Sequence, residues 1–211
     1  MKIGAKQNLL FIGDSITDAG RAQPVGSGGG LGAGYVSLVN ALLTATYPEL
    51  RIRVLNTGTS GHTVRDLAAR WKRDVIDLKP DWLSIMIGIN DVWRQFDCPL
   101  ESHIHVLPDE YEKTLKALVD KTQVKGLVMM TPYYIEDNTR DDMRARMDEY
   151  SAIVSRIAKQ TGAILVDTQA AFNTALKHLP SEMFAWDRVH PGTPGHMVLA
   201  KAFLDGVGFE W

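Results

Sequence analysis

The sequence contains almost no cysteine and no long apolar run, and its charges nearly balance. Cys98 is the only cysteine, so a disulfide bond within the chain and a zinc site built from several cysteines are both excluded. The 23 basic and 25 acidic residues give a net charge of −2, which provides no basic surface for nucleic acid or an anionic membrane. The longest apolar runs are far too short to form a membrane-spanning helix. We therefore expect a protein that binds neither nucleic acid nor membrane.

The beginning of the chain also lacks the pattern of a secretory signal peptide. Residues 1–8 contain neither a central apolar segment nor a small-residue cleavage site. Together with the single cysteine, this start predicts a cytoplasmic protein. The length of 211 residues and the hydrophobic content of 45% are typical of one globular domain. No repeat or linker divides the chain, so we expect a single domain over residues 1–211.

Short apolar runs alternate with amphipathic stretches along the chain. The apolar runs predict five strands that are buried on both faces, namely Leu9–Ile12, Ile52–Leu55, Trp82–Ile87, Gly126–Met130 and Ala163–Val166. The amphipathic stretches predict helices, namely Tyr35–Tyr47, Thr63–Leu78, Pro108–Thr122, Asp141–Thr161, Thr168–Lys177 and Pro194–Leu204. In Thr63–Leu78 the apolar residues recur at helical spacing, and Asp66, Arg70, Lys72 and Arg73 lie between them. The alternation predicts an α/β fold, a three-layer α/β/α sandwich around a parallel sheet.

A polar turn follows the first predicted strand directly. Gly13 allows the backbone to turn, so Ser15 stands at the carboxyl end of the strand, the edge where open parallel sheets bind ligands. A serine hydroxyl at this edge becomes a nucleophile when a base lies beside it. Taken alone, Ser15 would be interpreted as a cap for the next helix. Asp14 is a candidate catalytic carboxylate, but we expect it to order the turn by accepting backbone hydrogen bonds.

A candidate base lies near the end of the chain, where Asp187 precedes His190 by three residues. His190 can take the Ser15 proton, and Asp187 can hold the other ring nitrogen and fix the tautomer. Taken alone, Asp187 and His190 would be interpreted as a surface ion pair. The competing histidines are His62, His103, His105, His178 and His196. Two of them, His103 and His105, have the spacing of metal ligands, but no cysteine or carboxylate cluster accompanies them, and we expect no metal.

The ends of the second and third predicted strands supply hydrogen-bond donors. Gly58 follows the second strand, and Asn90 follows the third. If the strands are parallel, these segments lie beside Ser15 at one edge of the sheet. We expect the backbone amides of Ser15 and Gly58 and the side-chain amide of Asn90 to form an oxyanion hole. Ser60 is a rival nucleophile, although no strand end presents it as directly.

Four residues beside these segments are candidates for lining a substrate pocket: Asp14, His62, Trp93 and Trp186. For the two tryptophans, packing in the core is the alternative. The glycine-rich run Gly26–Gly34 is expected to be a mobile loop. It resembles a dinucleotide-binding fingerprint, but it lies well after the first strand and no Gly-Lys-Ser/Thr follows, so we do not expect nucleotide binding.

Four blocks of this sequence resemble, in order, those of the SGNH hydrolases, the GDSL-type esterases. The blocks are Gly13–Ile16, the segment around Gly58, Gly88–Asp91 and Asp187–His190, with Ile16 in place of the usual leucine. The four invariant residues of the family fall on Ser15, Gly58, Asn90 and His190. The resemblance covers essentially the whole chain. It implies a flavodoxin-like five-stranded sheet of order 2-1-3-4-5, and no metal or organic cofactor.

Within that family the chain looks most like bacterial acetylxylan esterases and related carbohydrate acetyl esterases. The likeness lies in Asn90–Gln95, Met130–Pro132 and Ala185–Pro191. It implies a serine esterase that removes short acyl groups, above all acetyl, from a small carbohydrate such as an acetylated xylo-oligosaccharide, through an acyl-Ser15 intermediate. The alternatives are a thioesterase or a lysophospholipase of the same fold, or a catalytically silent carbohydrate-binding module.

The C-terminal run Phe209–Trp211 is apolar. It would pack either on a second copy of the chain, making a homo-oligomer, or on the core of its own molecule.

Overall fold

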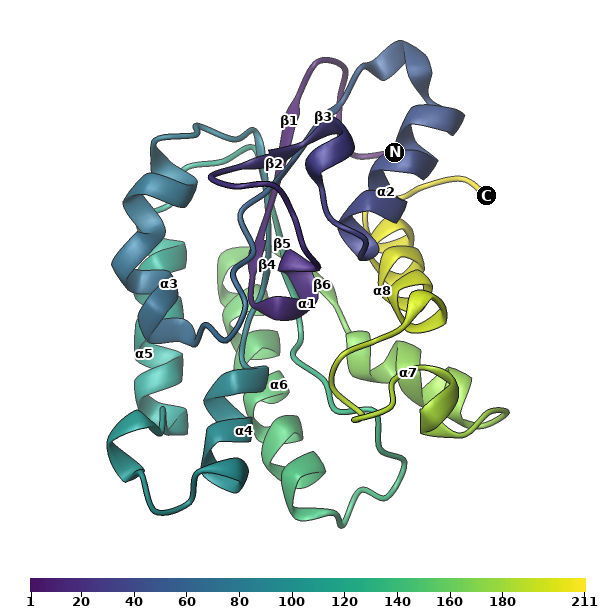
Figure 1. Cartoon of the computed structure of the whole chain (residues 1–211). Coiled ribbons are helices and arrows are strands. Elements are labelled where there is room, and N and C mark those ends of the chain that lie inside the picture. Colours follow the sequence, from purple (N-terminus) through teal and green to yellow (C-terminus); the bar gives the residue numbers. More distant parts are fainter.

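The computed structural model describes all residues from Met1 to Trp211. Its strands are β1 (Asn8–Gly13), β2 (Gly26–Ser27), β3 (Arg53–Asn56), β4 (Trp82–Met86), β5 (Gly126–Met130) and β6 (Ile164–Val166). Its helices are α1 (Ser15–Asp18), α2 (Tyr35–Thr46), α3 (Val64–Trp71), α4 (Ile89–Asp97), α5 (Pro108–Asp120), α6 (Asp142–Thr161), α7 (Thr168–Leu176) and α8 (Thr193–Gly206). The strands form one sheet of order β2-β3-β1-β4-β5-β6, and helices cover both of its faces (Figure 1).

The five predicted strands are confirmed, and so is their parallel order, since β3-β1-β4-β5-β6 is the expected 2-1-3-4-5. The prediction of a wholly parallel, five-stranded sheet was wrong in one respect. A sixth strand, β2, pairs antiparallel with β3 at the edge of the sheet. This strand comes from the glycine-rich run that was expected to be a mobile loop. The run forms β2, continues as a 3-10 turn over Gly28–Gly30, and leads into α2.

The sheet is buried because its strands are apolar on both faces. Leu9, Leu10, Phe11 and Ile12 of β1 have no exposed surface, and burying a side chain of this size contributes roughly 1.5–3 kcal/mol. On one face α2 packs against α8, and on the other α3 and α6 pack against α5 (Figure 1). The three predicted layers are therefore present.

Local signals fix where the helices begin. Thr63 and Asp66 form a capping box at the start of α3, and the Asp141 side chain accepts a hydrogen bond from the Arg144 amide at the start of α6. The predicted helix Thr63–Leu78 is α-helical only over α3 and continues as a π-helical turn over Lys72–Ile76.

The register of the sheet aligns the three strand ends that carry the candidate site. Gly13 of β1 lies opposite Met86 of β4, and Phe11 of β1 lies opposite Asn56 of β3. Two short helices that the sequence pattern did not predict, α1 and α4, start directly beyond these ends. The first turns of both helices therefore face the carboxyl edge of the sheet.

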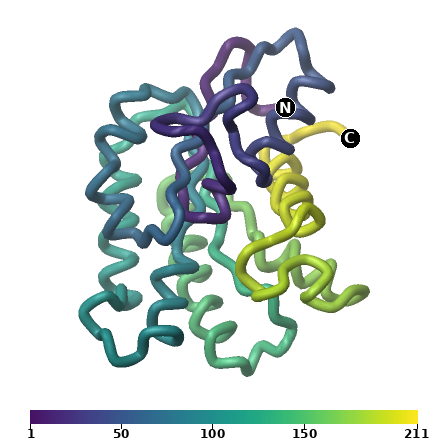
Figure 2. Tube along the Cα trace, viewed as in Figure 1, coloured from purple at the N-terminus to yellow at the C-terminus, as the bar shows by residue number.

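The two termini lie together at the opposite end of the molecule, where β1 begins (Figure 2). The Lys2 amide donates a hydrogen bond of 2.8 Å to the Val207 carbonyl, just beyond α8. None of the helices combines the length and the apolar character that crossing a membrane requires.

Candidate active site

Ser15, His190 and Asp187 form one continuous chain of hydrogen bonds. Ser15 Oγ lies 3.0 Å from His190 Nε2, although the two residues are 175 positions apart in the sequence. On the other side of the ring, His190 Nδ1 lies 2.6 Å from Asp187 Oδ2. A carboxylate can only accept here, so Nδ1 carries the proton and Nε2 is free to accept from the serine hydroxyl. The arrangement is that of a nucleophile, a base and a group that orients the base.

Asp187 also fixes the loop on which His190 lies. Its Oδ1 accepts hydrogen bonds from the amides of Val189, at 3.0 Å, and His190, at 2.8 Å. Burial by itself would raise the pKa of Asp187, but the hydrogen bonds from His190 and Val189 outweigh it and hold that pKa below its ordinary value. Asp187 is therefore a carboxylate at neutral pH, as an orienting and charge-stabilising partner must be.

The turn before Ser15 is held by Asp14. Its Oδ1 accepts from the Ile16 amide at 3.0 Å, so Asp14, not Ser15, caps α1. Burial raises the pKa of Asp14 to about 7, against the effect of this hydrogen bond. Asp14 is almost fully buried, so it orders the turn and has no surface with which to line a pocket. Gly13, expected to allow a sharp turn, is required for space instead, because a Cβ there would collide with the Met86 carbonyl and the Thr17 side chain.

Gly58 does not fit its predicted role as an oxyanion donor. Its amide already donates a hydrogen bond of 2.8 Å to Asn56 Oδ1, two residues earlier. Glycine is required at this position because a Cβ would come within 2.7 Å of the Thr17 carbonyl carbon in α1. Gly58 therefore allows the loop after β3 to pack directly on the helix that carries Ser15.

The loop after β3 contains a second glycine, Gly61, which the sequence motifs did not single out. The Gly61 amide has no acceptor within the chain, and the residue is exposed with a φ of +79°, a conformation that favours glycine. The next residue, His62, accepts a hydrogen bond of 2.9 Å from Asn90 Nδ2 through its carbonyl oxygen. The free amide of Gly61 therefore lies on the part of the loop that contacts Asn90.

Asn90, which follows the third predicted strand, lies in the first turn of α4. The Ser15 amide belongs to the first turn of α1, where N–H groups have no partner within the helix. Two short helices thus direct their positive ends toward the same edge of the sheet.

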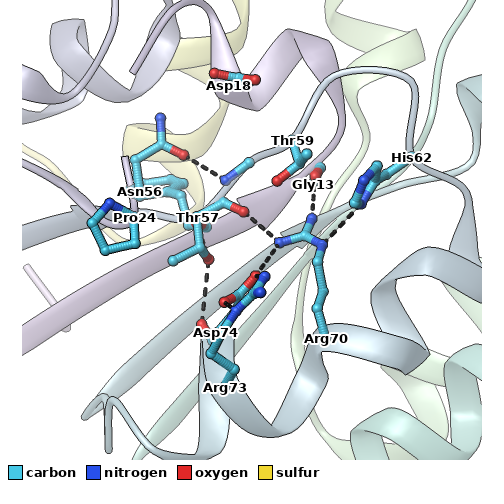
Figure 3. A network of polar contacts seen from close by, with 12 residues as sticks. Gly13, Asp18, Pro24, Asn56, Thr57, Thr59, His62, Arg70, Arg73 and Asp74 are labelled. Atoms are coloured by element: carbon cyan, nitrogen blue, oxygen red, sulfur yellow. Dashed lines mark hydrogen bonds and ion pairs between the residues drawn. The ribbon is translucent and has the colours of Figure 1, made fainter. Parts of the chain in front are cut away.

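Two buried arginines hold the backbone of the site, and the sequence pattern singled out neither of them. Arg70 lies between the apolar positions of its helix, where charged side chains are expected to face solvent. Only 6% of its surface is exposed. It donates to the carbonyls of Gly13, at 2.8 Å, and Thr57, at 2.5 Å, and it pairs with Asp74 at 2.9 Å (Figure 3). Arg70 thereby connects the end of β1 with the loop after β3.

The second of these arginines, Arg21, acts on the other side of Gly58. Its Nε donates to the Gly58 carbonyl at 2.5 Å, and its Nη1 donates to the Ala22 and Pro24 carbonyls. The peptide groups on both sides of Gly58 are therefore fixed. The sequence offers one signal for a buried arginine that holds backbone carbonyls. It is a charge within an amphipathic pattern whose opposite charge lies four positions away, as for Arg70 and Asp74.

The other three pocket candidates differ in exposure. The Trp93 ring is half-buried and lies 5.6 Å, centroid to centroid, from the His190 ring. Trp186 is 85% exposed, which excludes core packing for this residue. His62 is half-buried, and its Nδ1 accepts from Arg70 Nε at 3.0 Å.

The rival residues do not form a second site. Ser60 Oγ donates to Asp18 Oδ2 at 3.1 Å, and no histidine accepts a hydrogen bond from it. His105 Nε2 lies 2.9 Å from the carbonyl oxygen of Cys98. No group of three or more histidine, cysteine, aspartate or glutamate side chains is arranged to hold a metal ion.

Comparison with known proteins supplies relatives for the whole chain. Residues 11–198 match the GDSL-like Lipase/Acylhydrolase family. The acetylxylan esterase of Geobacillus stearothermophilus is 61% identical, with 100% of this chain and 98% of that protein covered.

Solved structures are also similar to this chain over nearly its whole length. The crystal structure of Axe2, an acetylxylan esterase from Geobacillus stearothermophilus, has a TM-score of 0.99 at 61% identity and covers 100% of this chain and 98% of its own. Variants of Axe2 in which a serine, an aspartate or a histidine is replaced by alanine are described as catalytic mutants. LAE5, an alpha/beta hydrolase enzyme from the metagenome of Lake Arreo in Spain, has a TM-score of 0.97 at 54% identity, with 99% of this chain and 98% of that chain covered.

Proposed function

The chain belongs to the GDSL-like lipase/acylhydrolase family, and we propose that it is a serine esterase that removes acetyl groups from xylo-oligosaccharides. Two observations support the reaction and its substrate. The first is the hydrogen-bonded chain from Ser15 through His190 to Asp187. The second is the 61% identity to an acetylxylan esterase over the full chain.

In the first half of the reaction, Ser15 Oγ attacks the acetyl carbonyl carbon while His190 Nε2 takes the hydroxyl proton. Asp187 stabilises the imidazolium that forms, because its carboxylate already accepts from Nδ1. Collapse of the tetrahedral intermediate breaks the ester bond, and His190 returns the proton to the departing sugar hydroxyl. The product is an acetylated Ser15.

In the second half, water takes the place of the sugar. His190 removes a proton from the water, which attacks the acetyl-Ser15 carbonyl, and acetate leaves as the Ser15 hydroxyl is restored. Each step uses the same hydrogen-bonded chain. No metal or organic cofactor takes part in this scheme.

The negative oxygen of each tetrahedral intermediate requires donors that are not already in use. We assign three donors to this role: the Ser15 amide, the second N–H of Asn90 Nδ2, whose other N–H donates to the His62 carbonyl, and the Gly61 amide in place of Gly58. The free N–H of Gly61 and its position beside the Asn90 contact support this choice, whereas the Gly58 amide is bound to Asn56.

The comparison with known proteins supports a small acyl group. The chain is 61% identical over its full length to an acetylxylan esterase. A long acyl chain would need a large apolar cavity beside the nucleophile.

The hydrogen bonds that join Ser15, His190 and Asp187 are the main support for the proposal. Kinetics on three classes of substrate tests it. We expect the protein to release acetate from acetylated xylo-oligosaccharides and p-nitrophenyl acetate, with little turnover of acyl-CoA or lysophospholipid. Ser15→Ala should lower kcat by a factor of about 10³–10⁶. Asp187→Asn should lower it about 10⁴-fold through the wrong imidazole tautomer, with the fold retained by circular dichroism. Near wild-type turnover by Ser15→Ala would end the serine mechanism, and a preference for acyl-CoA would identify a thioesterase.

The cytoplasmic location and the homo-oligomer stay predictions from the sequence. The single cysteine is compatible with the cytoplasm, and cell fractionation would test that location. Sedimentation would test for a homo-oligomer.

A further inference from the structure

His62 is tied to the candidate site through both its backbone and its ring. Its carbonyl oxygen accepts from Asn90 Nδ2 at 2.9 Å, and its ring Nδ1 accepts from Arg70 Nε at 3.0 Å. The ring is half-buried, so one part of it remains at the surface. It directly follows Gly61, and it therefore lies beside the proposed oxyanion donors.

Arg70 can act on His62 only as a hydrogen-bond donor. A guanidinium carries five N–H groups, has no acceptor and stays protonated in proteins. Here it is fixed by the Gly13 and Thr57 carbonyls and by its ion pair with Asp74, which is also buried (Figure 3). Nδ1 of His62 must therefore be the unprotonated ring nitrogen.

This contact selects one form of the His62 ring. With Nδ1 accepting, the neutral ring carries its proton on Nε2, which points away from Arg70 (Figure 3). Protonation of Nδ1 would place two donors face to face. In agreement, burial and the neighbouring Arg70 charge hold the pKa of His62 below its ordinary value. The Nε2–H group has no acceptor within the chain.

On the basis of the proposed esterase function, we propose that His62 is a substrate-binding residue whose Nε2–H, oriented by Arg70, donates a hydrogen bond to an oxygen of the acetylated sugar. A single neutral donor suits a hydroxyl, ring or glycosidic oxygen of an uncharged oligosaccharide. The donors of Ser15, Gly61 and Asn90 bind the acetyl carbonyl oxygen. The half-exposed His62 ring would then contact the sugar that carries the acetyl group. Arg70 is a positioning residue that sets the direction of the donor.

Kinetics with two substrates separates this role from a purely structural one. Acetylated xylo-oligosaccharide carries the sugar oxygens, and p-nitrophenyl acetate lacks them. In His62→Ala, we expect the ratio of kcat/KM for the oligosaccharide to that for p-nitrophenyl acetate to fall about five- to tenfold, mainly through KM. His62→Gln, which can accept from Arg70 and still donate, should recover most of the ratio. The exposed His178→Ala is the matched control and should keep the wild-type ratio.

Nitrogen NMR of the labelled histidine ring tests the orientation by Arg70 directly. The wild-type ring should show its proton on Nε2, with an apparent pKa below the ordinary 6.5. In Arg70→Lys, the two tautomers should mix and the pKa should rise. If that variant does not fold, the wild-type ring spectrum alone decides the tautomer.

The outcomes are distinct. An unchanged substrate ratio in His62→Ala, or a wild-type proton on Nδ1, would overturn the inference while leaving the esterase intact. Failure of the wild-type protein to release acetate from the oligosaccharide, with p-nitrophenyl acetate still cleaved, would overturn the proposed substrate and the sugar contact with it. The expected ratio, rescue by His62→Gln and the Nε2–H spectrum together would support the inference.

Discussion

At the scale of single residues, two carboxyl groups are buried at the strand ends that carry the site. Burial raises the pKa of both Asp14 and Asp91 to about 7. Asp91 Oδ1 accepts from the Val64 amide at 3.0 Å, but its Oδ2 has no partner. An unpaired oxygen in the interior favours the protonated acid. Asp91 therefore makes stability depend on pH.

The direction of that dependence follows from proton binding. An unfolded aspartate has a pKa of about 3.9, so between pH 4 and 7 the folded protein holds a proton that the unfolded chain has lost. The stabilisation is complete below pH 4 and is lost as the pH rises through about 7.

Asp91→Asn should remove this dependence, because the amide is neutral at every pH and its oxygen can still accept from Val64. We expect the melting temperature of the variant, relative to wild type, to rise by about 5 °C or more between pH 5 and 8. The exposed Asp205→Asn is the control and should show no such change. A constant difference across this pH range would show that Asp91 is ionised in the folded protein.

Sequence patterns could predict which residues meet at the site better than which atoms are available there. Ser15, Asp187 and His190 could be selected because their chemistry is interdependent and each stands beside a predicted element. The availability of the Gly58 amide depends on whether Asn56 turns its side chain back, which spacing alone does not reveal. Arg70 has the local pattern of a solvent-exposed charge, and only the packing of α3 against the sheet buries it.

At the scale of elements, the long strands and helices were predictable because each shows a sustained apolar pattern. The short elements were not. Helix α1 has only four residues, β2 has two, and α4 starts within a polar segment. These elements form because of contacts with distant segments, as when β2 pairs with β3. Helices α1 and α4 nevertheless carry Ser15 and Asn90, so two of these three poorly predictable elements position the chemistry.

The packing of α1 on the loop after β3 leads to a prediction at this scale. In Gly58→Ala, the new methyl group would meet backbone atoms of Thr17 and Asp18, which cannot move independently of α1. We expect a loss of about 1–3 kcal/mol in unfolding free energy. We also expect a fall in kcat of about 10²-fold, because α1 carries the nucleophile.

Gly29→Ala is the matched control for this prediction, since a Cβ there would meet nothing within 4 Å. Its melting temperature and kcat should equal those of the wild-type protein. Thermal unfolding and p-nitrophenyl acetate turnover measure both variants. Wild-type values for Gly58→Ala would show that α1 and the loop after β3 leave room for a methyl group.

At the scale of the whole molecule, we propose that residues 1–211 fold as a single domain. One continuous sheet and one core of 53 buried apolar residues support this proposal, because the core includes both Ile3 and Phe209. Within the C-terminal run, Phe209 is buried in its own molecule, whereas Trp211 is 62% exposed. The Phe209 ring lies 5.4 Å from the Tyr47 ring at 84°, and the Lys201 ammonium group lies 4.3 Å from the centroid of the Trp211 ring.

Phe209→Ala should therefore destabilise the entire protein. We expect a loss of about 3 kcal/mol, seen in calorimetry as a single transition whose midpoint falls by about 6–12 °C. Trp211→Ala, which removes a largely exposed ring, should cost less than about 1 kcal/mol. Two separate transitions in Phe209→Ala would contradict a single domain.

The contact between Ser15 and His190 spans almost the whole chain. During translation, Ser15 leaves the ribosome 175 residues before His190. A nascent polypeptide therefore stays inert toward esters until residue 190 has emerged and docked. Appearance of hydrolysis in a translation reaction would thus time the docking of His190 on Ser15, without any added label.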